Sequence, residues 1–269
     1  MTKTVRPAVK CHGGKFFLGS WIISHFPEDY EKLNYVEPYC GGANVLFQKN
    51  KSGIEVINDI DLPLINIYRA LRDEQKEFSR RLNLCEYSEE TFAKAVENSL
   101  NKDYDDYIDI AVNEFIVRRM SRGGLKKAFA WSNRLRGGQP GDVNAWKTAI
   151  ELLPELAERL KEVFIFNKNA TEVIHAFNTE DVLLYVDPPY LLETRVSKTV
   201  YSSELSTDDH IELSYLLNNF KGKAILSGYA SPLYSRLYKN WTVDKKKIAN
   251  HASQKAKKEK KEEFVWKNF

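Results

Sequence analysis

The feature that most constrains the fold is a continuous apolar run, Val-Leu-Leu-Tyr-Val at 182–186, which ends at Asp187 and two prolines. A strand that is buried on both faces of a parallel sheet has this composition, whereas a half-solvated strand alternates apolar and polar residues. Similar short segments alternate with stretches of helical spacing; they are 33–37, 54–57, 163–166 and 223–227. The alternation predicts a doubly wound α/β fold, with helices on both faces of a mostly parallel, twisted sheet.

Helices are expected where apolar residues recur at helical spacing. These segments are 43–48, 64–71, 108–116, 146–160, 171–177, 206–218 and 231–238. Pro154 predicts a break in the fourth of them, and Ser206, followed by Asp209, predicts an N-cap. Residues 241–248 and 263–266 are expected to form a last, antiparallel pair of strands around a lysine-rich loop.

The middle of the chain does not show this alternation of strand-like and helical segments. Residues 73–140 are richer in charged and aromatic side chains, and two glycine pairs, at 123–124 and 137–138, bracket a basic stretch. We interpret 73–140 as an inserted, mainly helical lobe. The α/β core is then formed by residues 1–72 and 141–269, which is a common size for an α/β domain.

The formal net charge is only +3, but basic residues are concentrated in parts of the chain. The stretch 118–136 contains no Asp or Glu, and its basic residues are Arg118, Arg119, Arg122, Lys126, Lys127, Arg134 and Arg136. A polyanionic partner such as nucleic acid fits this cluster, and a solvated basic face is the alternative. For the second basic run, Lys255 to Lys261, we expect the solvated face, on a loop or an exposed helix.

Other classes of protein are disfavoured by what the sequence lacks. No apolar run approaches the roughly 20 residues of a membrane-spanning helix, and the N-terminus has no signal-peptide pattern. The cysteines, Cys11, Cys40 and Cys85, are scattered and odd in number, which fits a reducing, cytoplasmic compartment. The histidines show no metal-ligand spacing, so we expect no metal site.

The tetrapeptide Asp187-Pro188-Pro189-Tyr190 stands directly at the carboxyl end of the expected central strand. Open α/β sheets bind their ligands at this edge. Two prolines fix the backbone and remove two N–H donors, which leaves carbonyls, one carboxylate and one aromatic ring. Such a rim can accept hydrogen bonds from an amine and stack on a planar group. An ordinary turn at a strand end is the alternative.

In this context the chain resembles the S-adenosylmethionine-dependent DNA adenine-N6 methyltransferases, whose catalytic motif is Asp-Pro-Pro-Tyr. Other motifs of that family match in its order, in the branch that includes Dam-type and phage orphan enzymes. They are Lys-Cys-His-Gly-Gly-Lys at 10–15, Val-Glu-Pro-Tyr-Cys-Gly-Gly-Ala at 36–43, Asn-Asp-Ile-Asp at 58–61 and Ser-Gly-Tyr at 227–229. Two positions depart from the family pattern: Cys11 replaces an aromatic residue, and Ala43 replaces the third glycine of the turn.

The resemblance implies a Rossmann-like methyltransferase core with an inserted target-recognition lobe. It implies transfer of the methyl group of S-adenosylmethionine to N6 of a flipped-out adenine in a specific sequence of double-stranded DNA, with S-adenosylhomocysteine as product. The catalytic residues would be Asp187, Pro188 and Tyr190. The cofactor-binding residues would be Cys11, Lys15, Tyr39, Gly41, Asp59 and Asp187.

Several of these assignments have alternatives in the sequence itself. Asp59 could accept the ribose hydroxyls or cap the next helix, a role that Asn58 or Asp61 could also fill. Lys15 would contact the cofactor carboxylate, hold the edge of the active site, or lie on the surface. Tyr39 would pack near the cofactor or belong to the core.

The basic stretch would form the surface that faces DNA. The expected contacts are Arg118, Arg119, Arg122, Lys126, Asn133, Arg134 and Arg136. Arginine and lysine bind phosphates, and asparagine can read adenine; Phe129 or Trp131 could fill the gap that a flipped base leaves. Two alternative functions stay open: transfer to cytosine N4 or an RNA base, and a non-catalytic nucleic-acid-binding relative. The sequence does not indicate the recognition sequence or the oligomeric state.

Overall fold

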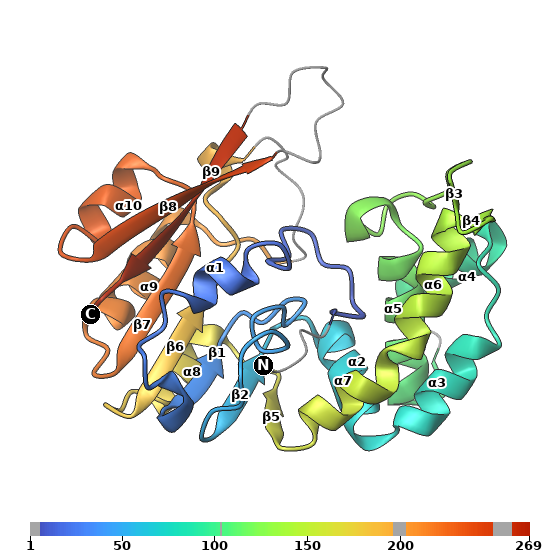
Figure 1. Cartoon of the computed structure of the whole chain (residues 1–269), viewed down its shortest axis with the longest axis horizontal. Coiled ribbons are helices and arrows are strands. Elements are labelled where there is room, and N and C mark those ends of the chain that lie inside the picture. Colours follow the sequence, from blue (N-terminus) through green and yellow to red (C-terminus); the bar gives the residue numbers. More distant parts are fainter. Residues whose placement is uncertain (1–5, 103, 196–202, 250–259) are drawn as a thin grey trace. The chain divides into compact units, whose positions relative to one another are not determined.

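The computed structural model describes residues 6–102, 104–195, 203–249 and 260–269 (Figure 1). The chain divides into two compact units, each built from several segments. Unit 1 comprises residues 1–25, 40–51 and 57–167, and unit 2 comprises residues 26–39, 52–56 and 168–269. No helix in the described part of the chain is long and apolar enough to cross a membrane.

The main sheet of the described residues has seven strands in the order β5-β2-β1-β6-β7-β9-β8. Their bounds are β1 Asn34–Glu37, β2 Glu55–Asn58, β5 Val163–Phe166, β6 Val182–Val186, β7 Lys223–Gly228, β8 Thr242–Ala249 and β9 Lys260–Lys267. The apolar run 182–186 is β6; all five of its residues are buried, and β6 pairs in parallel with β1 and β7. The expectation of a mostly parallel sheet with a central buried strand is therefore confirmed.

The last two strands are antiparallel, as expected. β9 pairs with β7 from Ile225–Lys267 to Gly228–Phe264, and β8 lies along the outer side of β9. In the second pairing Lys246 stands opposite Glu263. The lysine-rich run expected at 255–261 lies outside the described residues up to position 259, and its last two residues begin β9.

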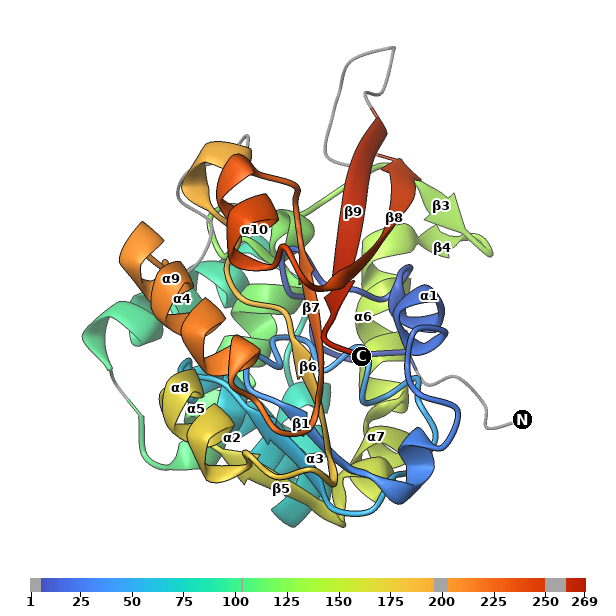
Figure 2. The same ribbon diagram turned by 90° about the vertical axis from the view of Figure 1, so that its left-hand side faces the viewer.

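The helices of unit 2 are α8 Ala170–Ala176, α9 Thr207–Asn218 and α10 Pro232–Leu237, with a 3-10 turn η3 at Leu192–Thr194 and another, η1, at Tyr30–Lys32. Helices α8 and α9 lie side by side (Figure 2). Ser206 caps α9 as predicted: its hydroxyl accepts from the Asp209 N–H, and the Asp209 carboxylate accepts from the Ser206 N–H, which satisfies two N-terminal donors. Tyr234 of α10 packs against His210 of α9 and Trp266 of β9.

Unit 1 is mainly helical. Its helices are α1 Gly19–Ile23, α2 Leu62–Asp73, α3 Gln75–Asn83, α4 Glu89–Asn101, α5 Tyr107–Arg119, α6 Gly141–Glu151 and α7 Leu153–Leu160. Helix α5 packs between α2 and α4, and most of its residues are buried. Phe115 of α5 contacts Phe78 of α3 and Trp146 of α6, with ring centroids 5.8 and 5.6 Å apart. The break predicted near Pro154 separates α6 from α7 at Leu152.

The helix expected at 43–48 is not formed. Ala43 has φ +48°, the left-handed region that a right-handed helix excludes, and the segment that follows it is a series of turns. The amphipathic pattern instead buries Val45, Leu46 and Phe47 without a helix. The apolar positions were correct, but the turn at Gly41 continues through Ala43 and prevents helical geometry.

The part of unit 1 between α5 and α6 holds a short 3-10 turn, η2 Arg122–Gly124, and a small hairpin of β3 Leu135–Arg136 and β4 Gln139–Pro140. Gly137 and Gly138 connect the two strands with φ +60° and +76°, values that a two-residue hairpin turn requires and that glycine adopts without strain. The predicted boundaries of an inserted lobe, 73–140, stay a prediction, because the compact units follow other boundaries.

Candidate functional site

The loop that follows β6 holds Asp187 and Tyr190 together. The Tyr190 hydroxyl lies 3.1 Å from Oδ1 of Asp187, and the tyrosine side chain is buried. Asp187 itself is half-buried and therefore reaches solvent. Burial, followed by the negative charges of Asp187 and Glu263, raises the pKa of Tyr190 well above its usual range, so the phenol keeps its hydrogen. The ring of Tyr229 meets that of Tyr190 edge to face at 4.7 Å.

The Tyr190 hydroxyl has a second carboxylate partner, Glu263 of β9, to which it can also donate a hydrogen bond. Glu263 is only 2% exposed. The sequence analysis did not single out this residue, although one signal was present. Residues two apart on a strand share a face, so Glu263 lies on the same face as the fully buried Val265.

Strands β1 and β6 run in parallel from Asn34–Val182 to Val36–Leu184, so the segments that follow them leave the same edge of the sheet. One of these segments contains Tyr39, which is half-buried, and the other contains Asp187. Below this edge the Tyr35 hydroxyl donates to Glu37 at 2.5 Å. The parallel pairing is therefore the reason that motifs about 150 residues apart in sequence begin at neighbouring positions.

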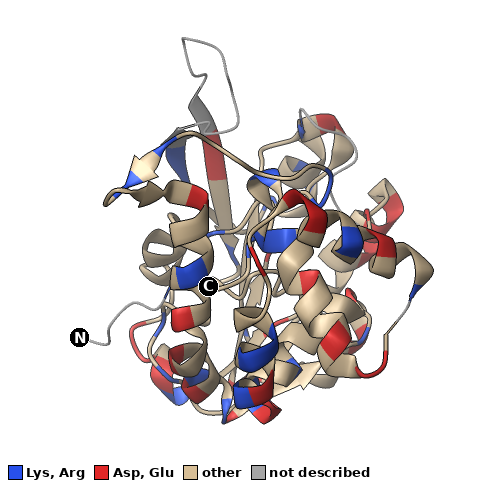
Figure 3. Cartoon of the chain, turned by 90° about the vertical axis from the view of Figure 1, so that its right-hand side faces the viewer, with Lys and Arg blue, Asp and Glu red and all other residues tan. Residues whose placement is uncertain are grey.

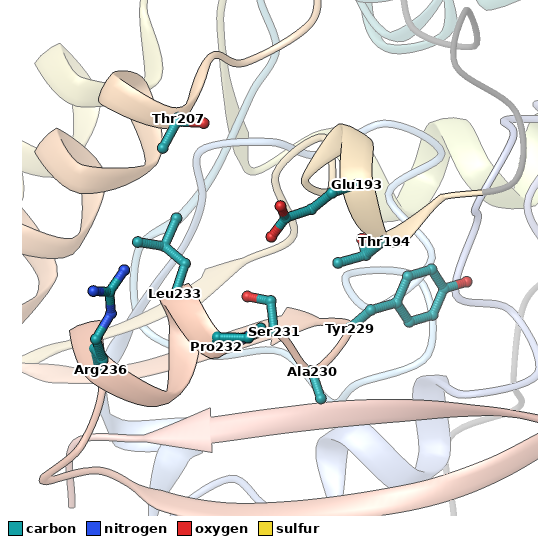
Figure 4. Close-up of a pocket in the computed structure, with 9 residues that line it drawn as sticks. All are labelled: Glu193, Thr194, Thr207, Tyr229, Ala230, Ser231, Pro232, Leu233 and Arg236. Carbon is teal, nitrogen blue, oxygen red and sulfur yellow. The ribbon is translucent and has the colours of Figure 1, made fainter.

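A cavity of about 550 Å³ lies in unit 2 between η3 and the segment that follows β7 (Figure 4). Its lining is mostly polar or aromatic: Glu193, Thr194, Thr207, Tyr229, Ala230, Ser231, Pro232, Leu233 and Arg236. In Figure 4 the carboxylate of Glu193 points toward the hydroxyl of Ser231. The cavity can receive a polar, planar group beside Tyr229.

Two hydrogen bonds hold the glycine turn after β1, and one of them involves Asp59, a residue expected near the cofactor. The Gly41 N–H donates to Oδ2 of Asp59 at 2.9 Å, and the Gly41 carbonyl accepts from the hydroxyl of Tyr68 at 2.6 Å. Gly41 has φ +47°, and a Cβ added there would meet nothing within 4 Å. The turn therefore borders open space. At Gly42 a Cβ would lie 2.8 Å from Nδ2 of Asn44, so a larger residue would require the Asn44 side chain to shift.

The structure separates the two roles that the sequence left open for Asp59. Asp61 is the N-cap of α2 and accepts from the Leu64 N–H. Asp59 accepts from the N–H groups of Gly41 and Asp61, one on each carboxylate oxygen. Burial raises its pKa above the usual range, against the lowering effect of these two bonds. An ionised carboxylate has about four acceptor positions, so this arrangement leaves capacity for the hydroxyls of a ribose.

Lys15 and Cys11 belong to the segment that precedes α1. Lys15 is buried and its Nζ donates to the Gly13 carbonyl at 3.1 Å, so it is not the surface lysine of the alternative reading. Cys11 is a free thiol, and the Arg118 guanidinium donates to its sulfur at 3.3 Å. Burial raises the pKa of the Cys11 thiol, with a smaller opposing effect of Arg118.

Arg118 is placed differently from the expectation of a side chain that faces DNA. It is 7% exposed, and its guanidinium donates to Asp61 at 2.8 Å and to Glu114 at 2.6 Å. Lys126 also approaches this cluster: its Nζ is ion-paired with Glu114 and lies 3.7 Å from Asp61. A phosphate contact by Arg118 would break these bonds in the interior of unit 1.

Arg119 is also engaged within unit 1. Its guanidinium donates to the Ala145 carbonyl at 2.7 Å, and burial lowers its pKa to about 10. The exposed members of the expected set are Arg122, Asn133, Arg134 and Arg136. Figure 3 shows basic and acidic residues interspersed along the helices.

The two aromatic residues expected near a flipped base differ in exposure. Phe129 packs against Tyr87 and Phe92, with ring centroids 5.3 and 6.1 Å apart. Trp131 is 68% exposed, and Leu135 of the hairpin is exposed to the same extent. Trp131 is therefore accessible from solvent, whereas Phe129 packs within unit 1.

Comparison with known proteins identifies the family. The D12 class of N6 adenine-specific DNA methyltransferases matches residues 12–261. A relative from Lactococcus lactis subsp. cremoris, the Type II methyltransferase M1.LlaDCHI, is 26% identical over 254 residues, which cover 90% of this chain and 87% of the relative. This family match covers most of the chain, and the chain belongs to the D12 class of N6 adenine-specific DNA methyltransferases.

Proposed function

We propose that Asp187 and the carbonyl of Pro188 accept the two N–H bonds of the adenine N6 amine. The observation that carries the proposal is the rigid Asp-Pro-Pro-Tyr turn at the carboxyl end of β6, where Asp187 reaches solvent and Tyr190 lies 3.1 Å from it. The N6 lone pair is delocalised into the ring and is a poor nucleophile. Two acceptors allow the nitrogen to rehybridise, so that its lone pair becomes available for attack.

The charge of Asp187 is central to this role. An ionised carboxylate is an acceptor only, whereas a protonated one would present a donor to the amine. Hydrogen bonds to a charged group are the stronger class, and the carboxylate also stabilises the positive charge that develops on N6 during attack. S-adenosylmethionine, when bound, supplies an electrophilic methyl group on its sulfonium. Asp187 then takes the proton that N6 loses, directly or through water.

For the cofactor we propose Gly41 and Asp59 as the principal binding residues. The open space at Gly41 allows close approach to the backbone, and Asp59 has acceptor capacity for ribose hydroxyls. Lys15 would contact the carboxylate of the cofactor, and Tyr39 would pack beside it. Cys11 is too small to stack as an aromatic residue would, so its contribution would be a van der Waals contact.

For the DNA we propose a contact surface formed by Arg122, Asn133, Arg134 and Arg136. These side chains are exposed, whereas Arg118, Arg119 and Lys126 are engaged within unit 1 and would support this surface from below. A base inside a duplex is out of reach, so the target adenine must flip out. Trp131 would fill the gap, and Tyr190 with Tyr229 would line the place of the flipped base.

The test uses methyl-tritiated S-adenosylmethionine with unmethylated genomic DNA, cytosine-only oligonucleotides and RNA in parallel, followed by nucleoside analysis. We expect label in N6-methyladenine from DNA alone, and mapping of the modified sites would give the recognition sequence. Label in N4-methylcytosine or in RNA would mean that cytosine N4 or an RNA base is the substrate instead of adenine in DNA. Cofactor binding without label in any of the three would point to other amino groups, and neither binding nor label would indicate a non-catalytic relative. With DNA as its substrate, we propose that the protein acts in the cytoplasm of a bacterial or phage-infected cell.

A further inference from the structure

Glu263 is a buried carboxylate that the reaction as described so far does not use. It comes from β9, far from the Asp-Pro-Pro-Tyr motif in sequence, and is 2% exposed. Its Oε1 accepts from the Tyr190 hydroxyl, while the same hydroxyl lies 3.1 Å from Oδ1 of Asp187. A burial of this kind is costly for a carboxylate unless a specific partner compensates it. Tyr190 is thus a bridge between two carboxylates, one that reaches solvent and one that does not.

The hydrogen atoms of this bridge can be counted. Tyr190 keeps its hydroxyl hydrogen, since its pKa is raised well above the usual range. A hydroxyl has one hydrogen to donate and two lone pairs to accept with. Both carboxylates lie within hydrogen-bond distance of the hydroxyl, so its single hydrogen can be donated to Asp187 or to Glu263 but not to both at once. When the hydrogen is donated to Glu263, the hydroxyl oxygen presents a lone pair to Asp187, which can use it only when Asp187 itself carries a hydrogen.

We propose that Glu263 is a positioning residue of the methyl transfer, which acts through Tyr190 to prepare Asp187 for the proton that N6 loses. This inference rests on the proposed role of Asp187. Before transfer, Glu263 accepts the Tyr190 hydrogen in place of Asp187, so this hydrogen does not compete with the amine for Asp187. After attack, the N6–H bond breaks and its proton passes to Asp187. The Asp187 O–H bond then breaks as its proton passes to the Tyr190 oxygen, while the Tyr190 O–H bond breaks and its original hydrogen passes to Glu263.

Every proton in these transfer steps is accounted for. One proton leaves N6, Asp187 returns to its ionised form, Tyr190 ends with one hydrogen as it began, and Glu263 gains one. The enzyme is reset when Glu263 gives this proton back along the same path to Asp187, which reaches solvent. No oxidant, reductant or additional reactant takes part.

Other titratable groups around Glu263 determine its charge before the reaction. Lys246 of β8 stands opposite it in the antiparallel register and favours the anion. Tyr185 of β6 is buried, and its pKa is raised well above the usual range, so it stays neutral; burial is the largest cause, followed by Asp187. Asp187 lies on the other side of the Tyr190 hydroxyl, and its negative charge disfavours a second negative charge on Glu263. The neighbour on β9, Glu262, pairs with Lys245 at 3.1 Å on the other face of the strand.

The test compares Glu263→Gln with Glu262→Gln, the same change one residue away on the opposite face of β9. For Glu263→Gln we expect kcat at pH 8 to fall by about tenfold to a hundredfold, the worth of one hydrogen bond to a charged group. The KM values for DNA and S-adenosylmethionine should stay within about twofold, because Glu263 touches neither. Glu262→Gln should leave kcat and both KM values unchanged.

The pH profile separates a proton role from a structural one. Protonated glutamate resembles glutamine, so the ratio of wild-type kcat to Glu263→Gln kcat should decrease toward one as the pH is lowered. A structural defect would give a ratio that does not depend on pH. A constant ratio, or a kcat within twofold of wild type at every pH, would overturn the proposal.

Tyr190→Phe keeps the ring and removes the bridge, which keeps the proposal testable if Glu263→Gln does not fold. It should lose kcat to the same extent, and the double variant should lose no more than either single one. Additive losses would contradict action through Tyr190. If wild type transfers no label to adenine, the proposed function fails; if wild type does and both variants match it, only the role of Glu263 fails.

Discussion

The guanidinium of Arg118 on α5 lies 2.8 Å from the carboxylate of Asp61, the N-cap of α2, and the two side chains are only 8% and 12% exposed. The same guanidinium binds Glu114 and the sulfur of Cys11. One side chain from the acid-free stretch therefore connects α5, the start of α2 and the segment that carries the Lys-Cys-His-Gly-Gly-Lys motif. This arrangement makes Arg118 a structural residue of unit 1.

Replacing Arg118 with alanine should destabilise the protein strongly. Loss of the guanidinium leaves Asp61 and Glu114 buried with one partner fewer, and breaking such a buried pair costs about 3–5 kcal/mol. The free energy of unfolding in urea measures the effect. Arg122→Ala is the matched control, since Arg122 is exposed and should change stability by no more than about 0.5 kcal/mol. Equal effects of the two changes would contradict the assignment.

The double change Arg134→Ala and Arg136→Ala should weaken DNA binding and reduce its salt dependence. Each lost phosphate contact lowers the slope of log K against log salt by about 0.9, so a loss of about 1.8 is expected. The measurement is a DNA-binding titration at several salt concentrations. Lys221→Ala with Lys239→Ala removes the same charge from exposed positions outside the basic stretch and should leave the slope unchanged. An unchanged slope in the arginine variant would remove both arginines from the interface.

Asp59→Asn should weaken the binding of S-adenosylmethionine. The amide keeps one oxygen acceptor but replaces the other with a donor, which opposes both the Gly41 N–H and a ribose hydroxyl. A loss of one or two bonds to a charged group predicts a Kd raised by about tenfold or more. Calorimetric titration measures it, with the exposed Asp73→Asn as a control at the other end of α2. Equal Kd values in wild type and Asp59→Asn would mean that the Asp59 carboxylate stabilises the glycine turn but does not bind the cofactor.

Asp187→Ala should abolish methyl transfer and leave the fold and much of the DNA affinity intact. The variant removes the acceptor of the N6 amine, and Asp187 lies in the loop after β6, outside the helices and strands that form the core. Nucleoside analysis after incubation with labelled S-adenosylmethionine gives the turnover. Asp208→Ala, an exposed carboxylate on α9, is the control. Turnover near that of wild type would refute the catalytic assignment of Asp187.

We expect the buried His210 to make the free energy of unfolding depend on pH. Its side chain is fully buried, Nδ1 is bonded to the Tyr234 hydroxyl at 3.0 Å, and burial lowers its pKa from 6.5 to about 4. The unfolded chain therefore binds a proton between these values that the folded protein does not. Stability contributed by neutral His210 is present above pH 6.5 and is lost as the pH falls toward 4.

The loss amounts to at most about 3 kcal/mol, at 1.36 kcal/mol for each unit of pKa. Urea unfolding at pH 7.5, 6.5, 5.5 and 4.5 measures it for wild type and for His210→Gln. Because glutamine does not titrate, the difference in unfolding free energy between the two proteins should shrink as the pH falls. A difference that is constant over this range would mean that His210 does not carry the effect.

The sequence by itself determined the features that depend on neighbours along the chain. The apolar run 182–186 is a strand buried on both faces because no residue in it can face water. Ser206 caps α9 because its hydroxyl reaches a donor three residues on. Strand ends also follow from the sequence, so the places of Gly41, Asp59 and Asp187 at the carboxyl ends of strands were predictable. The failure at 43–48 has a local cause too, the left-handed residue Ala43, which an apolar pattern does not reveal.

Only the tertiary structure decided which charges face water and which are buried. Arg118 and Arg134 are equally basic in the sequence, yet the first is enclosed by Asp61 and Glu114 and the second is exposed. Glu263 meets Tyr190 because β9 folds back beside β7, and nothing local to either residue records that pairing. The physical reason is that burial and ion pairing depend on partners distant in sequence, whereas periodicity, capping and turn geometry depend on residues within a few positions.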